Sequence, residues 1–359
     1  MVKHLQGIEP VTYSKSTEIE PDVVLSLNEL QYPISPKVIA ILKVEAENAS
    51  RYVYSGDKPT TDLQRAVAAY AGVEMPNICL DASLDLVLNH IPRVFLEPGD
   101  KTVFISPTYP EVEFGTLRAG GTPVKVPLTG EFELNADAVL EAIDEKTKIV
   151  FICNPNNPTS NAFPREEILR IVENCKCIAV VDECYYEYCG ETVADSTSLY
   201  PNMLVLRSFS KAFGLAGAKA SYLIGDEEII NCYKRILSGF ELTRFGVFGS
   251  LVALNDLEYY KELWKQVKDE RQSLIANLRA LGLRVFNSRA AYVFLDVLET
   301  GKRSAEIKDL FLRNYKILVR DVGVTFPDLG DKYVSFAVGT PVVNALLVEG
   351  FEDAIIKKI

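Results

Sequence analysis

The stretch CIAVVDECYYEYCGETVADSTSLYPNMLVLRSFSKAFGLAG, residues 177–217, decides the fold that the sequence predicts. It contains two apolar runs, 177–182 and 203–207, and polar side chains follow each of them. Continuous apolar runs of this length are typical of strands that are buried on both faces of a parallel sheet. The polar residues after each run are therefore expected at the carboxyl edge of the sheet, where open α/β folds bind ligands.

The same alternation extends outward on both sides of this stretch. Further strands are predicted at 102–106, 148–153 and 220–224, and amphipathic helices at 83–96, 135–144 and 164–174. Strands that alternate with helices in this way favour a mostly parallel sheet covered by helices. The predicted fold class is α/β.

The pattern of apolar and polar residues changes after about residue 246. One long helical run is followed by four strand-like segments, RVFN, AYVFLDV, KILVR and YVSFAV, and by a helix from about residue 341. These segments predict a smaller α+β domain, against which the first 45 or so residues are expected to pack. The expected division is a large domain at 48–246 and a small domain made of 1–47 and 247–359.

The composition narrows the class of partner. The chain has 38 Lys+Arg against 49 Asp+Glu and a formal charge of −11, so neither nucleic acid nor an anionic membrane is expected as a partner. It has no signal-peptide pattern and no membrane-length apolar stretch, which favours a cytoplasmic protein. Seven cysteines are expected to be buried reduced thiols. Only two histidines occur, so no metal site and no Ser/His/Asp triad is predicted.

Lys211 lies just after the strand 203–207, in SFSKAFGLAGAKASY, residues 208–222. A lysine at the end of a buried strand is partly desolvated, which lowers its pKa and leaves a neutral amine that can attack an aldehyde. Lys211 is therefore a candidate for a Schiff base. The alternative is a loop and helix start that carries two solvated lysines.

Two more strand ends carry candidate residues. Asp182 ends the strand 177–182, and Tyr185 follows three residues later. Beside a pyridinium ring such a carboxylate would keep a proton on the ring nitrogen, while a nearby phenol could donate to the 3-oxygen of the ring. Asn157, in NPNNPTS at 154–160, could aim its amide at the same ligand. The alternatives are a capping carboxylate and ordinary turn residues.

The remaining candidates lie nearer the amino terminus. Tyr109, in SPTYP at 106–110, could lie flat on an aromatic ligand or could be a surface turn tyrosine. DASLD at 81–85 precedes an amphipathic helix, so the backbone N–H groups of residues 82–84 would point out from a helix N-terminus. Such a terminus is a natural seat for a phosphate group.

Together these motifs resemble the fold type I pyridoxal-phosphate (PLP) enzymes, in particular the class I/II aminotransferases, and most closely the histidinol-phosphate aminotransferase family. The resemblance runs through LQGIEP, LNEL, SPKVI, FLEPGD, SPTYP, NPNNPTS, VVDECY, SKAFGLAG and VGTP, which together cover nearly the whole chain. It implies pyridoxal 5′-phosphate as the cofactor, a large domain with a mostly parallel sheet, and a smaller α+β domain.

The resemblance also assigns roles to residues. Lys211 would hold the cofactor aldehyde, Asp182 would pair with the pyridine nitrogen, Tyr185 and Asn157 would bind the 3-oxygen, and Tyr109 would stack on the ring. The phosphate would be surrounded by Ser83, Leu84, Ser208, Ser210 and Lys219. It further implies a homodimer in which Tyr54, or else Tyr52, reaches into the partner's site.

Departures from the family concern the substrate. Ser335 stands where the family has an anion-binding arginine, and a hydroxyl cannot replace that charge. Arg320 is kept, and Arg244 stands where small polar residues are usual, so these two arginines are hypothesised to form a changed anion pocket. Alternatively, Arg244 is a salt-bridge residue at an interface. In addition, Lys219 replaces an arginine, Ser160 a glycine and Leu84 an acidic residue.

The predicted function is amino transfer between a phosphate- or carboxylate-bearing amine and a 2-oxo acid, as in histidine biosynthesis. One alternative is a decarboxylase of a phosphorylated amino acid, similar to threonine-phosphate decarboxylase. A regulatory protein that has lost catalysis is disfavoured by the intact lysine, aspartate and tyrosine. A nicotinamide-dependent dehydrogenase is disfavoured because no G-x-G-x-x-G turn follows the first strand.

Overall fold

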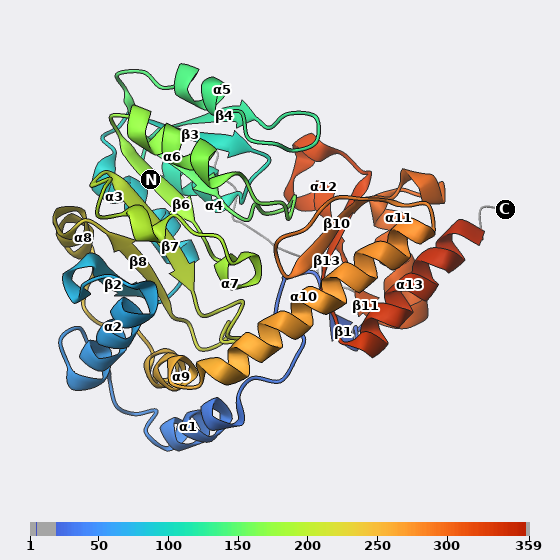
Figure 1. Cartoon of the computed structure of the whole chain (residues 1–359), viewed down its shortest axis with the longest axis horizontal. Coiled ribbons are helices and arrows are strands. Elements are labelled where there is room, and N and C mark those ends of the chain that lie inside the picture. Colours follow the sequence, from blue (N-terminus) through green and yellow to red (C-terminus); the bar gives the residue numbers. More distant parts are fainter. Residues whose placement is uncertain (1–4, 6–18, 357–359) are drawn as a thin grey trace.

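The structure is a computed structural model that describes Leu5 and residues 19–356. Most of the motif LQGIEP, residues 6–10, lies outside the described residues. A seven-stranded sheet with helices on both faces forms the larger part of the molecule, and a smaller part contains a four-stranded sheet (Figure 1). The long helix α10 (Leu257–Ala280) runs from the larger part to the smaller one (Figure 1).

The large sheet has the strand order β2-β8-β7-β6-β5-β3-β4. In this order the strands span Ile78–Asp81, Ser221–Gly225, Met203–Ser208, Ile178–Asp182, Thr147–Cys153, Lys101–Ser106 and Thr122–Pro127. All pairs are parallel except those that β8 makes with β2 and β7. The expected mostly parallel α/β sheet is confirmed.

The five predicted strands of this sheet all form, but β2 and β4 were not predicted. β4 reads TPVKVP, begins and ends near prolines and alternates polar with apolar residues. It lies at the edge of the sheet, where proline and charged residues are tolerated. A search for continuous apolar runs therefore does not find β4.

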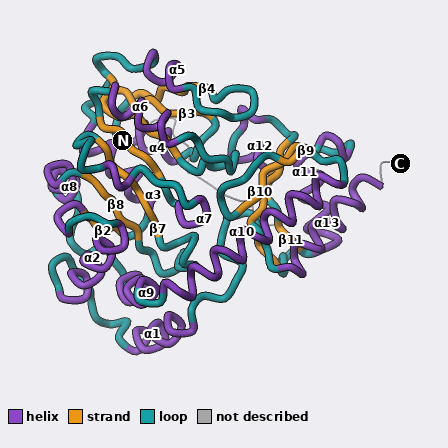
Figure 2. The backbone as a smooth tube through the Cα atoms, viewed as in Figure 1, coloured by secondary structure: helices purple, strands orange, loops and turns teal. Residues whose placement is uncertain are grey.

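Two layers of helices cover the large sheet (Figure 2). Alternate residues of each strand enter different clusters: Phe104 packs with residues of α3, α4 and α8, whereas Val103 and Ile105 belong to the cluster that contains α2, α5 and α6. Side chains of successive strand residues point to opposite faces, so continuous apolar strands require helices on both sides. These helices span Lys58–Ala71 (α2), Leu84–Phe95 (α3), Glu111–Arg118 (α4), Ala136–Glu141 (α5), Arg165–Asn174 (α6) and Glu227–Lys234 (α8).

The small sheet is antiparallel, with the order β12-β13-β10-β9. Its strands span Arg320–Asp321, Tyr333–Ala337, Tyr292–Asp296 and Arg284–Val285. The predicted segment KILVR is divided, because its first part forms β11 (Ile317–Leu318) and pairs with β1 (Val23–Val24) instead. Helices of this part span Ser304–Leu310 (α11), Val322–Thr325 (α12) and Pro341–Ile356 (α13).

The single long helical run predicted after residue 246 is wrong. The chain forms α9 (Arg244–Leu254) and then α10, separated by Asn255 and Asp256. Thr243 caps α9 by accepting a hydrogen bond from the backbone N–H of Gly246 at 2.9 Å. Asn and Asp compete for backbone hydrogen bonds and favour helix ends, which explains the break.

The N-terminal segment contacts both parts of the molecule. β1 joins β11 of the smaller part, whereas α1 (Pro36–Glu47) packs on α9, which in turn packs on α2. The division into 48–246 and 1–47 with 247–359 stays a prediction. Within the described residues, no helix combines the length and the apolar character that crossing a membrane requires.

Candidate active site

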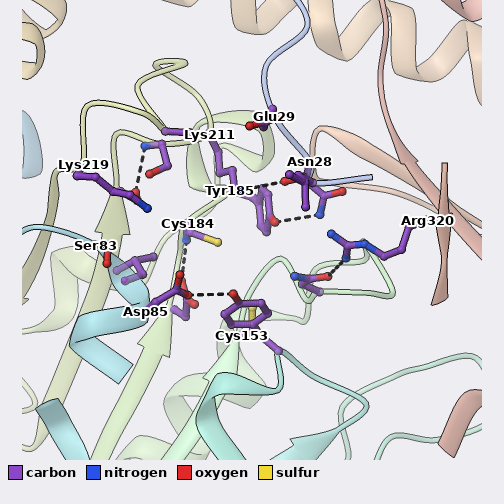
Figure 3. A pocket seen from close by; sticks show the side chains of 18 residues that line it. Asn28, Glu29, Ser83, Asp85, Cys153, Cys184, Tyr185, Lys211, Lys219 and Arg320 are labelled. Carbon is purple, nitrogen blue, oxygen red and sulfur yellow. Dashed lines mark hydrogen bonds between the residues drawn. The ribbon is translucent and has the colours of Figure 1, made fainter. Parts of the chain in front are cut away.

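A cavity of about 270 Å³ lies at the carboxyl ends of the parallel strands (Figure 3). It is lined by eleven of the residues singled out from the sequence, namely Ser83, Leu84, Tyr109, Asn157, Asp182, Tyr185, Ser208, Ser210, Lys211, Lys219 and Arg320. Segments as far apart in the sequence as residues 83 and 320 thus meet in one place. Tyr54 and Arg244 are not among the residues that line it.

Lys211 follows β7 by three residues, and neighbouring helices fix its backbone. Tyr188, in the short helix α7 (Tyr186–Cys189), donates to the Lys211 carbonyl at 3.3 Å, and Trp264 of α10 donates to the Ala212 carbonyl at 2.7 Å. The Lys211 Nζ atom donates to the carbonyl of Leu27 at 2.8 Å. Burial lowers the pKa of the Lys211 amine, which favours the neutral, nucleophilic form.

Asp182 is the last residue of β6 and only 3% of its surface is exposed. The backbone N–H of Cys184 donates to its Oδ1 atom at 3.0 Å. Burial raises the pKa of Asp182 to about 6. No ion pair of Asp182 occurs within the described residues. A buried carboxyl group at the edge of a cavity can form an ion pair with a cationic N–H group of a ligand.

Tyr185 and Asn157 approach the cavity from the strand ends of β6 and β5. The Tyr185 hydroxyl accepts a hydrogen bond from Asn28 Nδ2 at 3.1 Å, and its ring packs edge-on against Tyr292 with centroids 5.2 Å apart. Asn157 Oδ1 accepts a hydrogen bond from Arg320 Nη1 at 3.3 Å. Both side chains are held by neighbours, so they offer preorganised polar groups to a ligand.

The opposite end of the cavity suits an anion. It contains the N-terminus of the twelve-residue helix α3, capped by Ser83, together with two further serines and a lysine. Ser208 Oγ accepts from the Ser210 N–H at 3.0 Å, which fixes the loop between β7 and Lys211. Helix N-termini favour anions through their free N–H groups and the helix dipole. Lys219 adds a positive charge at this end (Figure 3).

A close backbone contact supports this anion-binding end. Lys219 has a φ of 60°, and a Cβ atom on Gly246 would lie 2.4 Å from the Lys219 carbonyl oxygen and 2.9 Å from that of Ala218. We expect Gly246→Ala to lower the free energy of unfolding by about 1–3 kcal/mol, because one of these backbones must move. Chemical denaturation checks this, with Gly130→Ala as the control, since a Cβ there meets nothing within 4 Å. Equal stability of both variants would contradict the expectation.

The sequence did not predict several residues of the cavity. Tyr109 donates to Asp85 Oδ1 at 2.9 Å, so Asp85 orients the tyrosine that was expected to stack on a ligand. The remaining unpredicted lining residues are Leu27, Asn28, Glu29, Cys153, Cys184 and Ala216. Residues 27–29 all belong to the motif LNEL, but no chemical pattern in it signals a contact with Lys211 or Tyr185, more than 150 positions away.

Arg244 does not line this cavity, so an anion pocket that it shares with Arg320 stays a prediction. Arg244 lies at the start of α9, pairs with the buried Glu45 of α1 at 2.5 Å, and its guanidinium stacks 4.9 Å from the Phe248 ring centroid. The Nε and Nη2 atoms of Arg244 both face Glu45 Oε2. The alternative, a salt-bridge residue, matches this position.

Arg320 enters the cavity from β12 of the small sheet. Its Nε atom donates to the carbonyl of Ser26 at 2.7 Å. Its neighbour in register on β13 is Ser335, which is fully buried and whose hydroxyl has no hydrogen-bond partner among the described residues. A buried serine with an unpaired hydroxyl supplies no charge, so Arg320 is the arginine that the structure brings to this cavity.

The structure also shows the local settings of Ser160, another departure from the family, and of the two tyrosines that the resemblance singled out. Ser160, which stands where the family has glycine, has a φ of 63°, a region that glycine adopts most easily. Tyr54 and Tyr52 are 50% and 80% exposed and pack against Phe240, which is 58% exposed. Whether either tyrosine reaches a partner's cavity stays a prediction.

Comparison with known proteins agrees with the geometry. The sequence model of the family described as aminotransferase class I and II matches residues 20–348. A histidinol-phosphate aminotransferase from Methanothermobacter thermautotrophicus is 33% identical over 349 residues, which are 94% of this chain and 92% of that protein. A histidinol-phosphate aminotransferase from Methanopyrus kandleri is 31% identical and shares 97% of this chain and 94% of its own.

Solved structures share the fold. The histidinol-phosphate aminotransferase of Sinorhizobium meliloti, in complex with pyridoxal-5′-phosphate, superposes with a TM-score of 0.88 at 22% identity, over 100% of this chain and 98% of that one. The L-threonine-O-3-phosphate decarboxylase of Porphyromonas gingivalis superposes with a TM-score of 0.81 at 19% identity, over 93% of this chain and 100% of that one. With the family model spanning most of the sequence, the chain belongs to the aminotransferase class I and II family.

Proposed function

We propose that this protein is a PLP-dependent aminotransferase of the histidinol-phosphate type, which moves an amino group between a phosphate-bearing amine and a 2-oxo acid. The observation that carries the proposal is a single cavity that contains Lys211, Asp182, Tyr185 and an anion-binding helix end. Relatives that are about one third identical over nearly the full chain bear the same enzyme name.

The cavity residues fit the parts of PLP one by one. The buried carboxyl group of Asp182 suits a pyridinium N–H, and Tyr185 and Asn157 suit a ring oxygen. The N-terminus of α3, with Ser208, Ser210 and Lys219, suits a phosphate. When bound, PLP supplies an aldehyde and an electron-withdrawing ring that stabilises negative charge at the substrate Cα.

The chain's own residues then divide the work. Lys211 would hold the cofactor through its amine, and the same amine in its neutral form would act as the base at the substrate Cα. Burial lowers the pKa of the Lys211 amine, which favours the neutral form that can take up a proton. Asp182 supplies the negative charge that keeps the cofactor ring protonated, and Tyr109 and Asp85 form one wall of the cavity.

The test of this proposal starts from the purified protein with added PLP. Reduction with borohydride is expected to attach the cofactor covalently to Lys211, which peptide mass spectrometry locates. Incubation with histidinol phosphate and a panel of 2-oxo acids should then yield the corresponding amino acid. Attachment at another lysine, or no amino acid with any oxo acid, would refute the proposal.

A decarboxylase of a phosphorylated amino acid is the second candidate. A threonine-phosphate decarboxylase shares the fold over its whole length, and the same cofactor residues suit both reactions. The two reactions differ in product, because decarboxylation releases carbon dioxide and leaves the amino group on the product. Release of carbon dioxide from O-phosphothreonine, without any transfer of the amino group, would favour this candidate.

Arg320 is expected to hold the anionic group of the substrate. It is the arginine that lines the cavity, and its Nε and Nη1 atoms are already positioned by Ser26 and Asn157. We expect Arg320→Ala to lower kcat/KM for histidinol phosphate by about 10- to 150-fold, because a charge-assisted hydrogen bond contributes about 1.5–3 kcal/mol.

Steady-state kinetics with Arg244→Ala as the comparison separates the two arginines. Arg244 pairs with Glu45 outside the cavity. Arg244→Ala should therefore lower the free energy of unfolding, and its effect on kcat/KM should be smaller than that of Arg320→Ala. A larger loss of kcat/KM in Arg244→Ala than in Arg320→Ala would contradict the assignment.

We also propose that the protein forms a homodimer. Tyr52, Tyr54 and Phe240 form an exposed aromatic cluster, and single soluble chains seldom expose several large aromatic side chains together. Sedimentation of the purified protein tests this state, and Tyr54→Ala should reduce activity only if that side chain reaches the partner's cavity. The cytoplasmic location stays a prediction.

A further inference from the structure

A second cavity, of about 540 Å³, lies between α10 and the loop at 287–289. Its charged lining residues are Lys268, Arg271, Arg279 and Arg289, and no aspartate or glutamate lines it among the described residues. The first three lie on one face of α10, at helical spacing. This cavity shares no lining residue with the candidate active site. A basic cavity is unexpected in a chain with a formal charge of −11.

Arg271 is the residue that makes this cavity unusual. Only 3% of its surface is exposed, and its Nη1 atom donates to the Ala290 carbonyl at 2.6 Å. Its Nε atom is buried without a hydrogen-bond partner, and no ion pair of Arg271 occurs within the described part of the chain. Burial, and then repulsion from Arg289, lower the pKa of Arg271 to about 10. A buried guanidinium without a counter-charge is costly.

Two of the other cations are held in position by hydrogen bonds and an ion pair. Arg279 donates through Nε and Nη2 to the Val285 carbonyl at 3.1 and 2.7 Å, and through Nη2 to Asn287 Oδ1 at 2.8 Å. Arg289 donates to the Cys189 carbonyl at 3.1 Å and pairs with Glu191 at 2.5 Å. Glu191 therefore offsets one of the four positive charges.

We propose that this cavity is a second anion-binding site, which takes a small oxyanion of the phosphate class. A phosphate group offers several acceptor oxygens and up to two negative charges, which suits guanidinium groups that converge on one space. It would supply the counter-charge that Arg271 lacks. The proposal does not depend on the reaction catalysed in the first cavity.

Calorimetric titration of the PLP-saturated protein with inorganic phosphate, in chloride buffer of matched ionic strength, tests the site. Arg320→Ala serves as the background, because it removes the arginine that holds anions in the first cavity. In that background phosphate is expected to bind, and the added pair Lys268→Ala and Arg279→Gln is expected to weaken its Kd at least about tenfold. Both substituted residues are exposed on α10, so the variant should fold.

The matched control is the pair Lys148→Ala and Arg313→Gln, which removes the same two charge types from exposed positions that do not line the cavity. It should leave the Kd for phosphate unchanged within about twofold. Equal weakening by both pairs would mean that only overall charge matters. That result, or no phosphate binding in the Arg320→Ala background, would overturn the proposal.

Discussion

Replacing Lys211 with alanine is expected to lower the rate of amino transfer by more than about 10⁴-fold, because one side chain provides both the attachment of the cofactor and the base that moves the proton. The lysine lines the same cavity as Asp182 and Tyr185, and burial lowers its pKa. Lys219 also lines this cavity, but it lies at the anion-binding end and does not directly follow β7 (Figure 3). Single-turnover kinetics with histidinol phosphate measures the effect.

Two controls separate chemistry from folding in this experiment. Lys148→Ala removes an exposed lysine and should leave both the rate and the unfolding midpoint unchanged. Lys211→Ala should keep a wild-type unfolding midpoint within a few degrees while it loses activity. Added methylamine, a small external base, should restore part of the proton transfer. A Lys211→Ala enzyme that turns over at the rate of the wild type would refute the assignment of this residue.

The strand ends of the large sheet could be predicted from sequence because two simple patterns coincide there. Asp182 and Asn157 follow apolar runs that are buried on both faces, and parallel strands bring their carboxyl ends to one edge. Such residues need no knowledge of distant contacts. The cavity therefore contains the predicted residues of β5, β6 and β7.

Long-range contacts were beyond the reach of local patterns. Asn28 reaches Tyr185 across 157 positions, and Glu45 meets Arg244 across 199. No periodicity or turn signal indicates which distant carboxylate an arginine will find. For that reason the hypothesis for Arg244, which rested on an unusual charge at this position, did not include its partner in α1.

The break between α9 and α10 shows a different limit. The pattern of apolar residues continues across Asn255 and Asp256 with helical spacing, so periodicity alone favours one helix. Asp256 instead accepts hydrogen bonds from Ser35 Oγ at 2.6 Å and pairs with Lys37 at the start of α1. The contacts of Asp256 with α1, together with the end of α9, therefore set the direction in which α10 begins.

Asp182→Asn is expected to affect stability and catalysis in opposite directions. In the protein without PLP, burial raises the pKa of Asp182 to about 6 from its ordinary value of 3.8. The folded state therefore holds its proton more tightly than the unfolded state, and stability falls as pH rises between about 4 and 6. Above that window the buried charge costs about 3 kcal/mol. Asparagine does not titrate and can still accept from Cys184 N–H, so the PLP-free variant should be more stable at pH 8.

In the PLP-bound enzyme the sign reverses, because a pyridinium N–H needs the carboxylate charge that asparagine lacks. We expect kcat to fall by about 10²–10³-fold, the size typical of a lost electrostatic partner in a buried site. Thermal unfolding with and without PLP at pH 5 and pH 8, together with kcat, measures both effects, and the exposed Asp269→Asn is the control. A purely structural carboxylate would lower stability in both forms when replaced, whereas a cofactor partner destabilises only the PLP-free protein, so the sign of the PLP-free difference at pH 8 decides between them.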